Sequence, residues 1–166
     1  MSKFVSLSEY IAKEQVECLN EDPDYPVRNV FTSDPTRFLQ SDIDPQLLIS
    51  VPFRVPVKLG ALKLSFREGI DKSCIPSSVK IFTNRNSSGF IDVESLNPVQ
   101  TISREELLSG NEIPLRFVLF QNILSVQLFV EDNAGSDKTE IGEVEFFGMQ
   151  AENMDMKEFK KVTDDE

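Results

Sequence analysis

Histidine and tryptophan are both absent from the 166 residues of this chain. Without histidine the chain cannot form a Ser-His-Asp or Cys-His catalytic group, and it cannot form an H-E-x-x-H zinc site. Only carboxylates, lysine, tyrosine and cysteine are left as candidate acid–base groups. Tryptophan is the usual residue for stacking on sugars, so its absence removes the commonest platform for glycan binding. The missing histidine therefore argues against an enzyme, and the missing tryptophan argues against a glycan-binding protein.

Cysteine is also scarce, with two copies and no C-x-x-C string. This excludes a thioredoxin-type redox motif and a zinc ribbon. Two free thiols in a reducing compartment are the simplest interpretation, although a Cys18–Cys74 disulfide stays open. Cys18 has the acidic neighbours Glu17 and Glu21, which should raise the pKa of its thiol. We therefore expect Cys18 to be a small buried apolar residue and not a reactive nucleophile.

The seven glycines are dispersed, so no glycine loop that could cradle a phosphate is present. No stretch is apolar enough and long enough to span a bilayer. The N-terminus, Met1 to Phe4, is not followed by the apolar run of a secretory signal. We therefore expect no cofactor, no metal ion and no membrane association.

The formal charge is −11, from 28 acidic and 17 basic residues. Such a chain repels nucleic acid phosphates and anionic lipid headgroups, so we expect no nucleic acid partner. Two interpretations stay open. The charge could match a basic protein surface, or it could simply keep the protein soluble. No basic cluster in the sequence offsets it.

The length suits one domain, and the 40% content of hydrophobic residues is ordinary for a globular protein. We predict a single domain over residues 1–160, monomeric, followed by an acidic tail at 161–166. The tail ends in three consecutive acidic residues and is expected to be disordered.

From Leu47 onward the sequence has the pattern of β-strands. Apolar residues alternate over 57–59 and again over 62–66, but they change parity at Gly60-Ala61. Such a change requires a bulge or a bend, because each later side chain switches faces. Further strands are expected at 79–82, 115–120, 126–130 and 144–146.

The segment 115–120 is apolar on both faces except for Arg116. It is predicted to be a strand in the middle of a covered sheet, with Phe117 buried. Many short strands separated by turn residues, without a long amphipathic helix, are typical of an antiparallel sandwich. The predicted fold class is therefore an all-β antiparallel β-sandwich with short peripheral helical turns.

Two capping boxes predict those helical turns. Ser6 to Glu9 should begin a short helix that ends near Val16, and Ser103 to Glu106 should begin another that closes at Gly110. The polar, proline-containing segment 20–37 is predicted to be an irregular loop. Four apolar side chains should pin it to the sandwich: Val27, Val30, Phe31 and Phe38.

Three polar pairs are the candidate site residues. The carboxylates of the D-x-D string at 42–44 and of the pair at 131–132 could hold Ca²⁺ or perform glycosidase chemistry, but capping of backbone N–H groups is favoured. The amides at 121–122 could tie a turn or form a polar recognition patch, and the structural role is favoured. The candidate partner-binding residues are Asp42, Asp44, Gln121, Asn122, Glu131 and Asp132.

Five strings occur in an order that carries a family resemblance. They are E-C-L-N-E at 17–21, F-L-Q-S-D-I-D-P-Q-L-L-I at 38–49, V-K-I-F at 79–82, P-L-R-F through F-Q-N at 114–122, and N-M-D-M-K-E-F-K at 153–160. Together they resemble the PITH domain, the proteasome-interacting domain found at the C-terminus of certain cytosolic thioredoxin-like proteins and as a stand-alone protein.

The resemblance implies a galactose-binding-like jelly-roll sandwich without catalytic activity. It also implies association with the regulatory particle of the 26S proteasome, in the cytoplasm and the nucleus. The chain would then be a stand-alone member or the C-terminal part of a thioredoxin-like protein. The alternative is a ligand-binding β-sandwich that recognises a glycan or a peptide. An enzyme is a third hypothesis, disfavoured by the missing histidine and redox motif.

Overall fold

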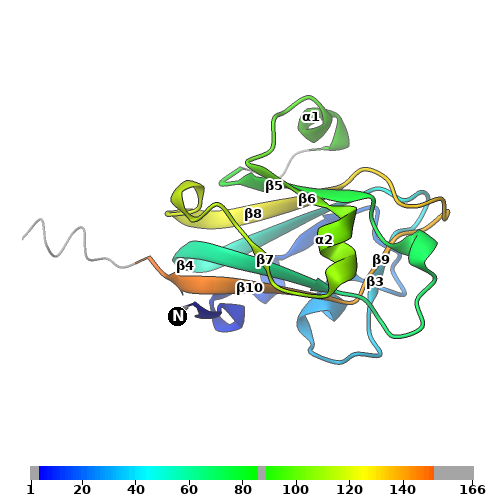
Figure 1. The fold of residues 1–166 in the computed structure, drawn as a ribbon, viewed down its shortest axis with the longest axis horizontal. Coiled ribbons are helices and arrows are strands. Elements are labelled where there is room, and N and C mark those ends of the chain that lie inside the picture. The colour runs from blue at the N-terminus through cyan, green and yellow to red at the C-terminus, as the bar shows by residue number, and fades with distance from the viewer. Residues whose placement is uncertain (1–3, 86–88, 152–166) are drawn as a thin grey trace, which may run out of the picture.

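One long strand, β4 (Leu47–Ser65), connects the two layers of the structure. In this computed structural model, residues 4–85 and 89–151 are described. The pairing of β4 with β8 (Ile123–Val130) shifts register between Pro52 and Val57. Proline cannot donate a ladder hydrogen bond, and Pro52 and Pro56 both lie in this interval. There the strand turns and runs back in the other layer (Figure 1).

The first layer pairs five strands in the order β2, β4, β8, β5 and β6, all antiparallel. Besides β4 and β8 they are β2 (Glu17–Leu19), β5 (Ser78–Thr83) and β6 (Gln100–Ser103). In the second layer the returning half of β4 pairs with β7 and β10, and β10 pairs with β1. These are β7 (Ile113–Pro114), β10 (Glu143–Gln150) and β1 (Val5–Ser6).

Because β4 belongs to both layers, the antiparallel pairing is continuous and the sheet curls into a sandwich. A separate two-stranded ribbon joins β3 (Leu39–Gln40) to β9 (Glu140–Ile141). The predicted class, an all-β antiparallel sandwich with short peripheral helical turns, is confirmed.

The predicted change of parity in β4 is a β-bulge. Phe147 lies opposite Ala61 and Gly148 lies opposite Leu59, so Gly60 is the extra residue. A side chain at Gly60 would overlap the ring of Phe4, and one at Gly148 would overlap the backbone of Lys58. Gly148 therefore lets the two strands pass closely at the bulge, and Gly60 leaves room for the Phe4 ring.

The core lies between the layers and follows the alternation seen in the sequence. Val57 and Leu59 are buried before the bulge, and Leu62 and Leu64 are buried after it. A smaller apolar cluster covers the outer face of the first layer under α1 (Phe90–Glu94). Its buried members are Leu48, Phe82, Val93 and Phe129.

The predicted strand at 115–120 was wrong. Residues Phe117–Leu119 form the 3₁₀ turn η5, Phe117 is half-buried, and only Leu115 and Phe120 are buried. The Gln100 side chain donates to the carbonyl of Pro114 and accepts from the N–H of Arg116, which occupies groups that a neighbouring strand would need. A short apolar run cannot by itself distinguish a strand from a turn that crosses the end of a sandwich.

The predicted helix ending near Val16 was also wrong. Two separate 3₁₀ turns, η1 (Ser8–Tyr10) and η2 (Lys13–Gln15), follow β1. The N–H of Leu7 donates to the carbonyl of Phe146 at 2.9 Å, and the N–H of Ala12 donates to Pro52 at 2.9 Å. These long-range backbone bonds replace the helical bonds that the local pattern suggested.

The second capping box is confirmed. Ser103 and Glu106 satisfy each other's backbone N–H groups at the start of α2 (Arg104–Ser109), and Gly110 ends the helix with a φ of 73°. The loop 20–37 contains the 3₁₀ turn η3 (Val27–Phe31), whose Val27 and Val30 are buried as predicted. A last turn, η4, spans Lys72–Cys74. The family string at 153–160 and the predicted acidic tail at 161–166 lie outside the described residues.

Candidate interaction sites at the two ends of the sandwich

The candidate residues fall into two groups at opposite ends of β8. Asn122 precedes this strand and Glu131 follows it, and eight extended residues span about 26 Å. Leu47 pairs with Val130, so the 42–44 string lies at the same end as 131–132. We call the end formed by 41–46, 66–77 and 131–140 the acidic end. We call the end formed by 53–58, 84–85, 115–124 and 147–151 the η5 end.

Asn20 organises the acidic end. Its side-chain amide donates to Asp44 Oδ1 at 2.9 Å and to the carbonyl of Gln46 at 2.8 Å, and its Oδ1 accepts from the N–H of Ile43 at 3.2 Å. Asp44 Oδ1 also caps the N–H of Gln46 at 3.0 Å. Asp44 therefore has the backbone-capping role that the sequence favoured.

A buried polar network attaches the 131–140 loop to the 41–46 segment. Ser41 Oγ accepts from the N–H of Thr139 at 2.8 Å, and Thr139 Oγ1 donates to the carbonyl of Pro45 at 2.7 Å. Asn133 Nδ2 donates to Thr139 Oγ1 at 3.1 Å. All three side chains are buried, so the network joins the two loops through hydrogen bonds shielded from water.

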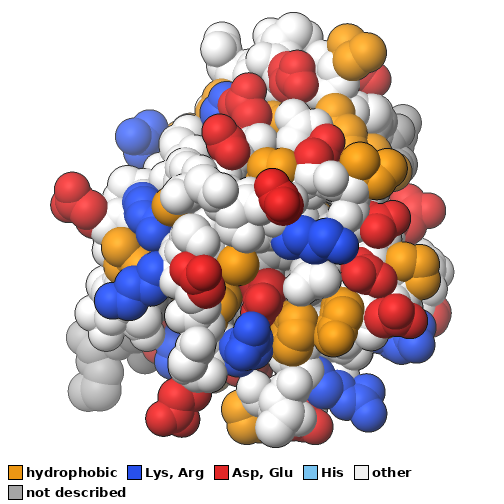
Figure 2. Space-filling model, turned by 90° about the vertical axis from the view of Figure 1, so that its right-hand side faces the viewer, with side chains coloured by type: hydrophobic (Ala, Val, Ile, Leu, Met, Phe, Trp, Pro, Cys, Tyr) orange, Lys and Arg blue, Asp and Glu red, His pale blue; other side chains and the backbone are white. Residues whose placement is uncertain are grey.

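Several carboxylates at the acidic end already have partners. Glu131 accepts from Lys80 Nζ at 3.1 Å, and Asp132 accepts from the N–H of Asn133 at 2.8 Å. Buried Glu140 forms two bonds with Arg67, at 2.6 and 3.1 Å. Asp42 is exposed. Figure 2 shows acidic and basic side chains interspersed over this face.

Gln121 and Asn122 lie at the η5 end, away from the other four candidates. The Gln121 side chain donates to the carbonyl of Phe117 and ties the turn, as the sequence favoured. Asn122 takes part through its main chain, because Asn84 Nδ2 donates to its carbonyl at 2.9 Å. Asn84 Oδ1 also accepts from the N–H of Leu124 at 2.7 Å, so two side chains hold this end together.

Apolar side chains are exposed around the same turn. Val118 is 81% exposed, Leu119 49% and Leu124 51%. Phe117 contacts Phe4, with ring centroids 5.2 Å apart. Sequence reasoning missed this surface because it placed the apolar run 115–120 in the core.

Basic residues also lie at the η5 end. The segments that form it contain four cations and no acidic residue: Arg54, Lys58, Arg85 and Arg116. The acidic-end segments contain eight carboxylates and three cations. Arg54 pairs with Glu14 at 3.0 Å, whereas within the described ranges the other three form no ion pair. Because the four come from three separate segments of the sequence, only the fold could place them at one end.

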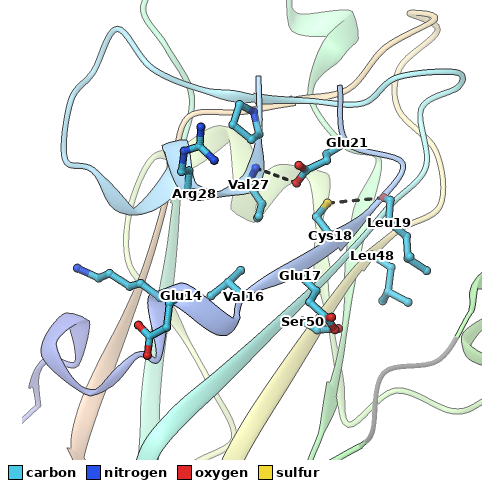
Figure 3. A pocket seen from close by; sticks show the side chains of 12 residues that line it. Glu14, Val16, Glu17, Cys18, Leu19, Glu21, Val27, Arg28, Leu48 and Ser50 are labelled. Atoms are coloured by element: carbon cyan, nitrogen blue, oxygen red, sulfur yellow. Dashed lines mark hydrogen bonds between the residues drawn. The ribbon is translucent and has the colours of Figure 1, made fainter. Parts of the chain in front are cut away.

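A groove of about 530 Å³ runs along β2 (Figure 3). The Cys18 thiol lies in its wall, where burial and then the nearby Glu21 carboxylate raise the pKa of the thiol. Glu21 itself accepts from the N–H of Val27 at 3.0 Å. Such a thiol stays protonated near neutral pH, as the sequence predicted, and Cys18 and Cys74 are both free.

Two kinds of feature are absent from residues 4–85 and 89–151. No helix there has the length and apolarity to cross a membrane. Nor do three or more acidic or cysteine side chains gather there in an arrangement that could hold a metal ion.

A family model described as PITH domain matches residues 1–164. The chain belongs to the PITH domain family. It is 37% identical to Thioredoxin-like protein 1 of Schizosaccharomyces pombe over 152 residues, which cover 87% of this chain and 51% of that protein. It is 31% identical to human PITH domain-containing protein 1 over 134 residues, 77% of this chain and 62% of that protein. This PITH domain thus spans about half to three-fifths of these two relatives.

Solved structures with the same fold include two carbohydrate-binding proteins of Clostridium perfringens. The fifth family 32 module of its family 89 glycoside hydrolase, solved with GalNAc-β-1,3-galactose, aligns with a TM-score of 0.65, 12% identity and coverage of 87% of this chain and all of that module. Two such modules of ZmpB, solved with GalNAc, align with a TM-score of 0.68, 10% identity and coverage of 89% and 37%. At such identities the likeness establishes only the galactose-binding-like fold of this PITH domain.

The fold explains two of the strings that carried the family resemblance. Asn20 of E-C-L-N-E bonds directly to the D-I-D part of the second string, and Glu21 forms an isolated bridge with Ser41. Contacts within the fold of this PITH domain therefore account for these two strings. The string at 114–122 differs, because it contains the exposed turn η5.

Proposed function

We propose that this PITH domain is a non-catalytic docking module that attaches to the regulatory particle of the 26S proteasome, in the cytoplasm and the nucleus. Family membership over residues 1–164 is the observation that carries the proposal. In a longer protein the module would bring an attached domain, such as a thioredoxin-like one, to the proteasome, and so act as an adaptor in ubiquitin-dependent degradation.

The chemistry of the chain supports a docking role. It has no histidine and no C-x-x-C string, and the Cys18 thiol has a raised pKa. Both ends of the sandwich are instead held in defined conformations by side-chain bonds, such as those of Asn20 and Asn84. A surface that is ordered before binding loses less conformational entropy when a partner arrives.

The test is capture of purified particles on the immobilised chain. We expect the 26S proteasome and the isolated regulatory particle to be retained, and the 20S core to pass through. A heat-denatured sample of the same chain is the control for non-specific retention. Failure to retain the regulatory particle above this control would overturn the proposal.

The glycan-binding alternative rests only on the shared fold, and the same protein can test it. Galactose and GalNAc glycans on an array should not retain the chain. Retention on these glycans, together with no capture of the proteasome, would replace the docking proposal with a lectin function.

A further inference from the structure

We infer that the η5 end is the docking surface of this domain, and that it binds an acidic partner segment that carries apolar side chains. The inference deepens the proposed function and rests on it where the partner is taken to belong to the proteasome. The juxtaposition that carries it is an exposed apolar turn at the same end as Lys58, Arg85 and Arg116, which form no ion pair with any described residue, in a chain with a net charge of −11.

The apolar part of the surface consists of Val118, Leu119 and Leu124. Val118 is 81% exposed, and about half of Leu119 and of Leu124 is exposed. All three lie at the same end of the sandwich, with Leu119 and Leu124 on either side of the turn that Gln121 and Asn84 hold in place. Apolar side chains that gather in this way mark contact sites for other proteins.

The turn is held in place before any partner arrives. The Phe120 carbonyl accepts from the N–H of Leu59 at 2.9 Å, and Phe120 is fully buried beneath the turn. The N–H of Leu115 donates to the carbonyl of Gly60 at 2.9 Å on the other side of η5. Val118 is thus presented from a turn anchored at both ends, which lowers the entropy lost on binding.

The charges of the η5 end indicate the charge of the partner that it binds. Its segments contain four of the 17 cations of the chain and none of the 28 acidic residues. Among the described residues Lys58, Arg85 and Arg116 form no ion pair, and of these three Arg116 is exposed while Lys58 and Arg85 are partly buried. Complementary charge around an apolar centre favours an acidic segment and disfavours a basic one.

Two other kinds of partner also match part of this surface. The experiments below distinguish them from an acidic protein segment. A second copy of this chain offers Ile43, which is exposed between Asp42 and Asp44. An RNA offers phosphates, but the net charge of −11 opposes its approach. The observations favour the protein segment because the centre of the surface is aliphatic, while bases stack on aromatic side chains.

The direct experiment uses a short synthetic peptide of Glu, Leu and Gly and a counterpart in which Lys replaces Glu. Binding to the whole chain is measured by fluorescence anisotropy, and the site is mapped by NMR amide shifts. We expect the Glu peptide to bind with shifts centred on 115–124, and the Lys peptide not to bind there. Equal binding of both peptides, or shifts confined to the acidic end or to the β2 groove, would overturn the inference.

Four variants locate the interaction, each with a check of the melting temperature. Val118→Glu should weaken binding of the Glu peptide by about tenfold or more, and Arg116→Glu should weaken it several-fold. The matched controls are Ile91→Glu, at an apolar residue 83% exposed on α1, and Arg28→Glu, at an exposed arginine beside the β2 groove. Equal losses in the controls and the test variants would reject the surface.

Two measurements decide between the occupants. Self-association in analytical ultracentrifugation that Val118→Glu abolishes would show that a second copy takes the site. Competition by poly(U) RNA for the Glu peptide would show a nucleic acid site. Either result overturns the inference.

Capture of the purified 26S proteasome separates this inference from the proposed function. If wild type and Val118→Glu capture it equally, docking stands and the η5 end is not its surface. If wild type captures no proteasome but binds the Glu peptide at 115–124, the surface stands and the proposed partner is wrong.

Discussion

Asn20 shows how a single polar side chain can join two distant parts of the chain. It adopts a φ of 71°, in the left-handed region, where asparagine is tolerated better than most residues. From there its amide reaches the 43–46 segment with bonds of 2.8 to 3.2 Å. The acidic end therefore depends on one residue that the sequence marked only as part of a family string.

Replacing Asn20 with alanine should lower the free energy of unfolding by about 1–3 kcal/mol, because backbone and carboxylate groups of 43–46 lose their partner. Urea unfolding followed by circular dichroism measures this loss. Asp42→Ala is the control, since this exposed side chain should leave stability nearly unchanged. A loss for Asn20→Ala no larger than that of the control would contradict the structural role.

The raised pKa of Glu143 predicts that the stability of the domain depends on pH. Burial raises the pKa of its carboxyl, and the neighbouring Glu145 raises it further, while Lys63 opposes the shift. A carboxyl with a raised pKa binds its proton more tightly in the folded than in the unfolded state. Ionisation therefore lowers stability as the pH rises through the raised pKa.

Glu143→Gln should consequently raise the melting temperature at neutral pH, and the gain should vanish below about pH 4, where wild-type Glu143 is protonated in both states. Thermal unfolding at several pH values measures it. Glu17→Gln, at an exposed glutamate on β2, is the matched control. A gain that is the same at every pH would rule out Glu143 as the titrating group.

At the scale of elements, the bulge in β4 keeps the apolar residues of the returning half buried on both sides of Gly60. The segments before and after Gly60 each keep their own alternation, and Gly60 absorbs the extra residue. The close approach depends differently on the two glycines. Gly148 faces backbone atoms of Lys58, whereas Gly60 faces the ring of Phe4, which can move.

Gly148→Ala should therefore be destabilising by about 1–3 kcal/mol, as other overpacked sites are, and Gly60→Ala should be milder. Chemical unfolding of the two variants in parallel gives the comparison. Equal losses, or a larger loss at Gly60, would show that the Phe4 ring is the tighter constraint.

The turn η5 separates two phenylalanines that the sequence pattern treats alike. Phe120 is fully buried, so Phe120→Ala should be destabilising by about 3–5 kcal/mol. Phe117 is half-buried, and Phe117→Ala should lower stability by less than half as much. The urea midpoint of each variant, read with its m-value, measures the difference. A reversed order would restore the strand that the sequence predicted.

At the scale of the whole molecule, the acidic end and the η5 end carry opposite excess charge. A partner would therefore encounter the domain in a preferred orientation. The partner-binding roles of Asp42, Asp44, Glu131 and Asp132 stay predictions. Their surface would suit a basic partner, while the η5 end suits an acidic one.

The whole chain should not catalyse disulfide exchange. It lacks C-x-x-C, and a Cys18 thiol with a raised pKa supplies little thiolate. With thioredoxin reductase and NADPH, the rate of insulin reduction should equal that of the buffer. A thioredoxin added in the same assay is the positive control. A rate above buffer that Cys18→Ser removes would contradict the proposed lack of catalysis.

The sequence by itself determined the features that depend on near neighbours. Alternation before and after Gly60 revealed two strand segments with a bulge or a bend between them, and Ser103 with Glu106 revealed a helix start, because side-chain direction and end capping are local properties. It also determined which chemistry is unavailable, since no fold can supply a missing histidine.

Only the tertiary structure decided which side chains are exposed and which distant segments lie together. The run 115–120 looks like a core strand, yet Gln100 and the core site filled by Phe120 turn it into η5. The N-terminal segment does not form the predicted helix, because its backbone N–H groups bond to β10 and β4. The cations of the η5 end come from segments dozens of residues apart. A local sequence pattern does not show which distant segments lie at the same end of the fold.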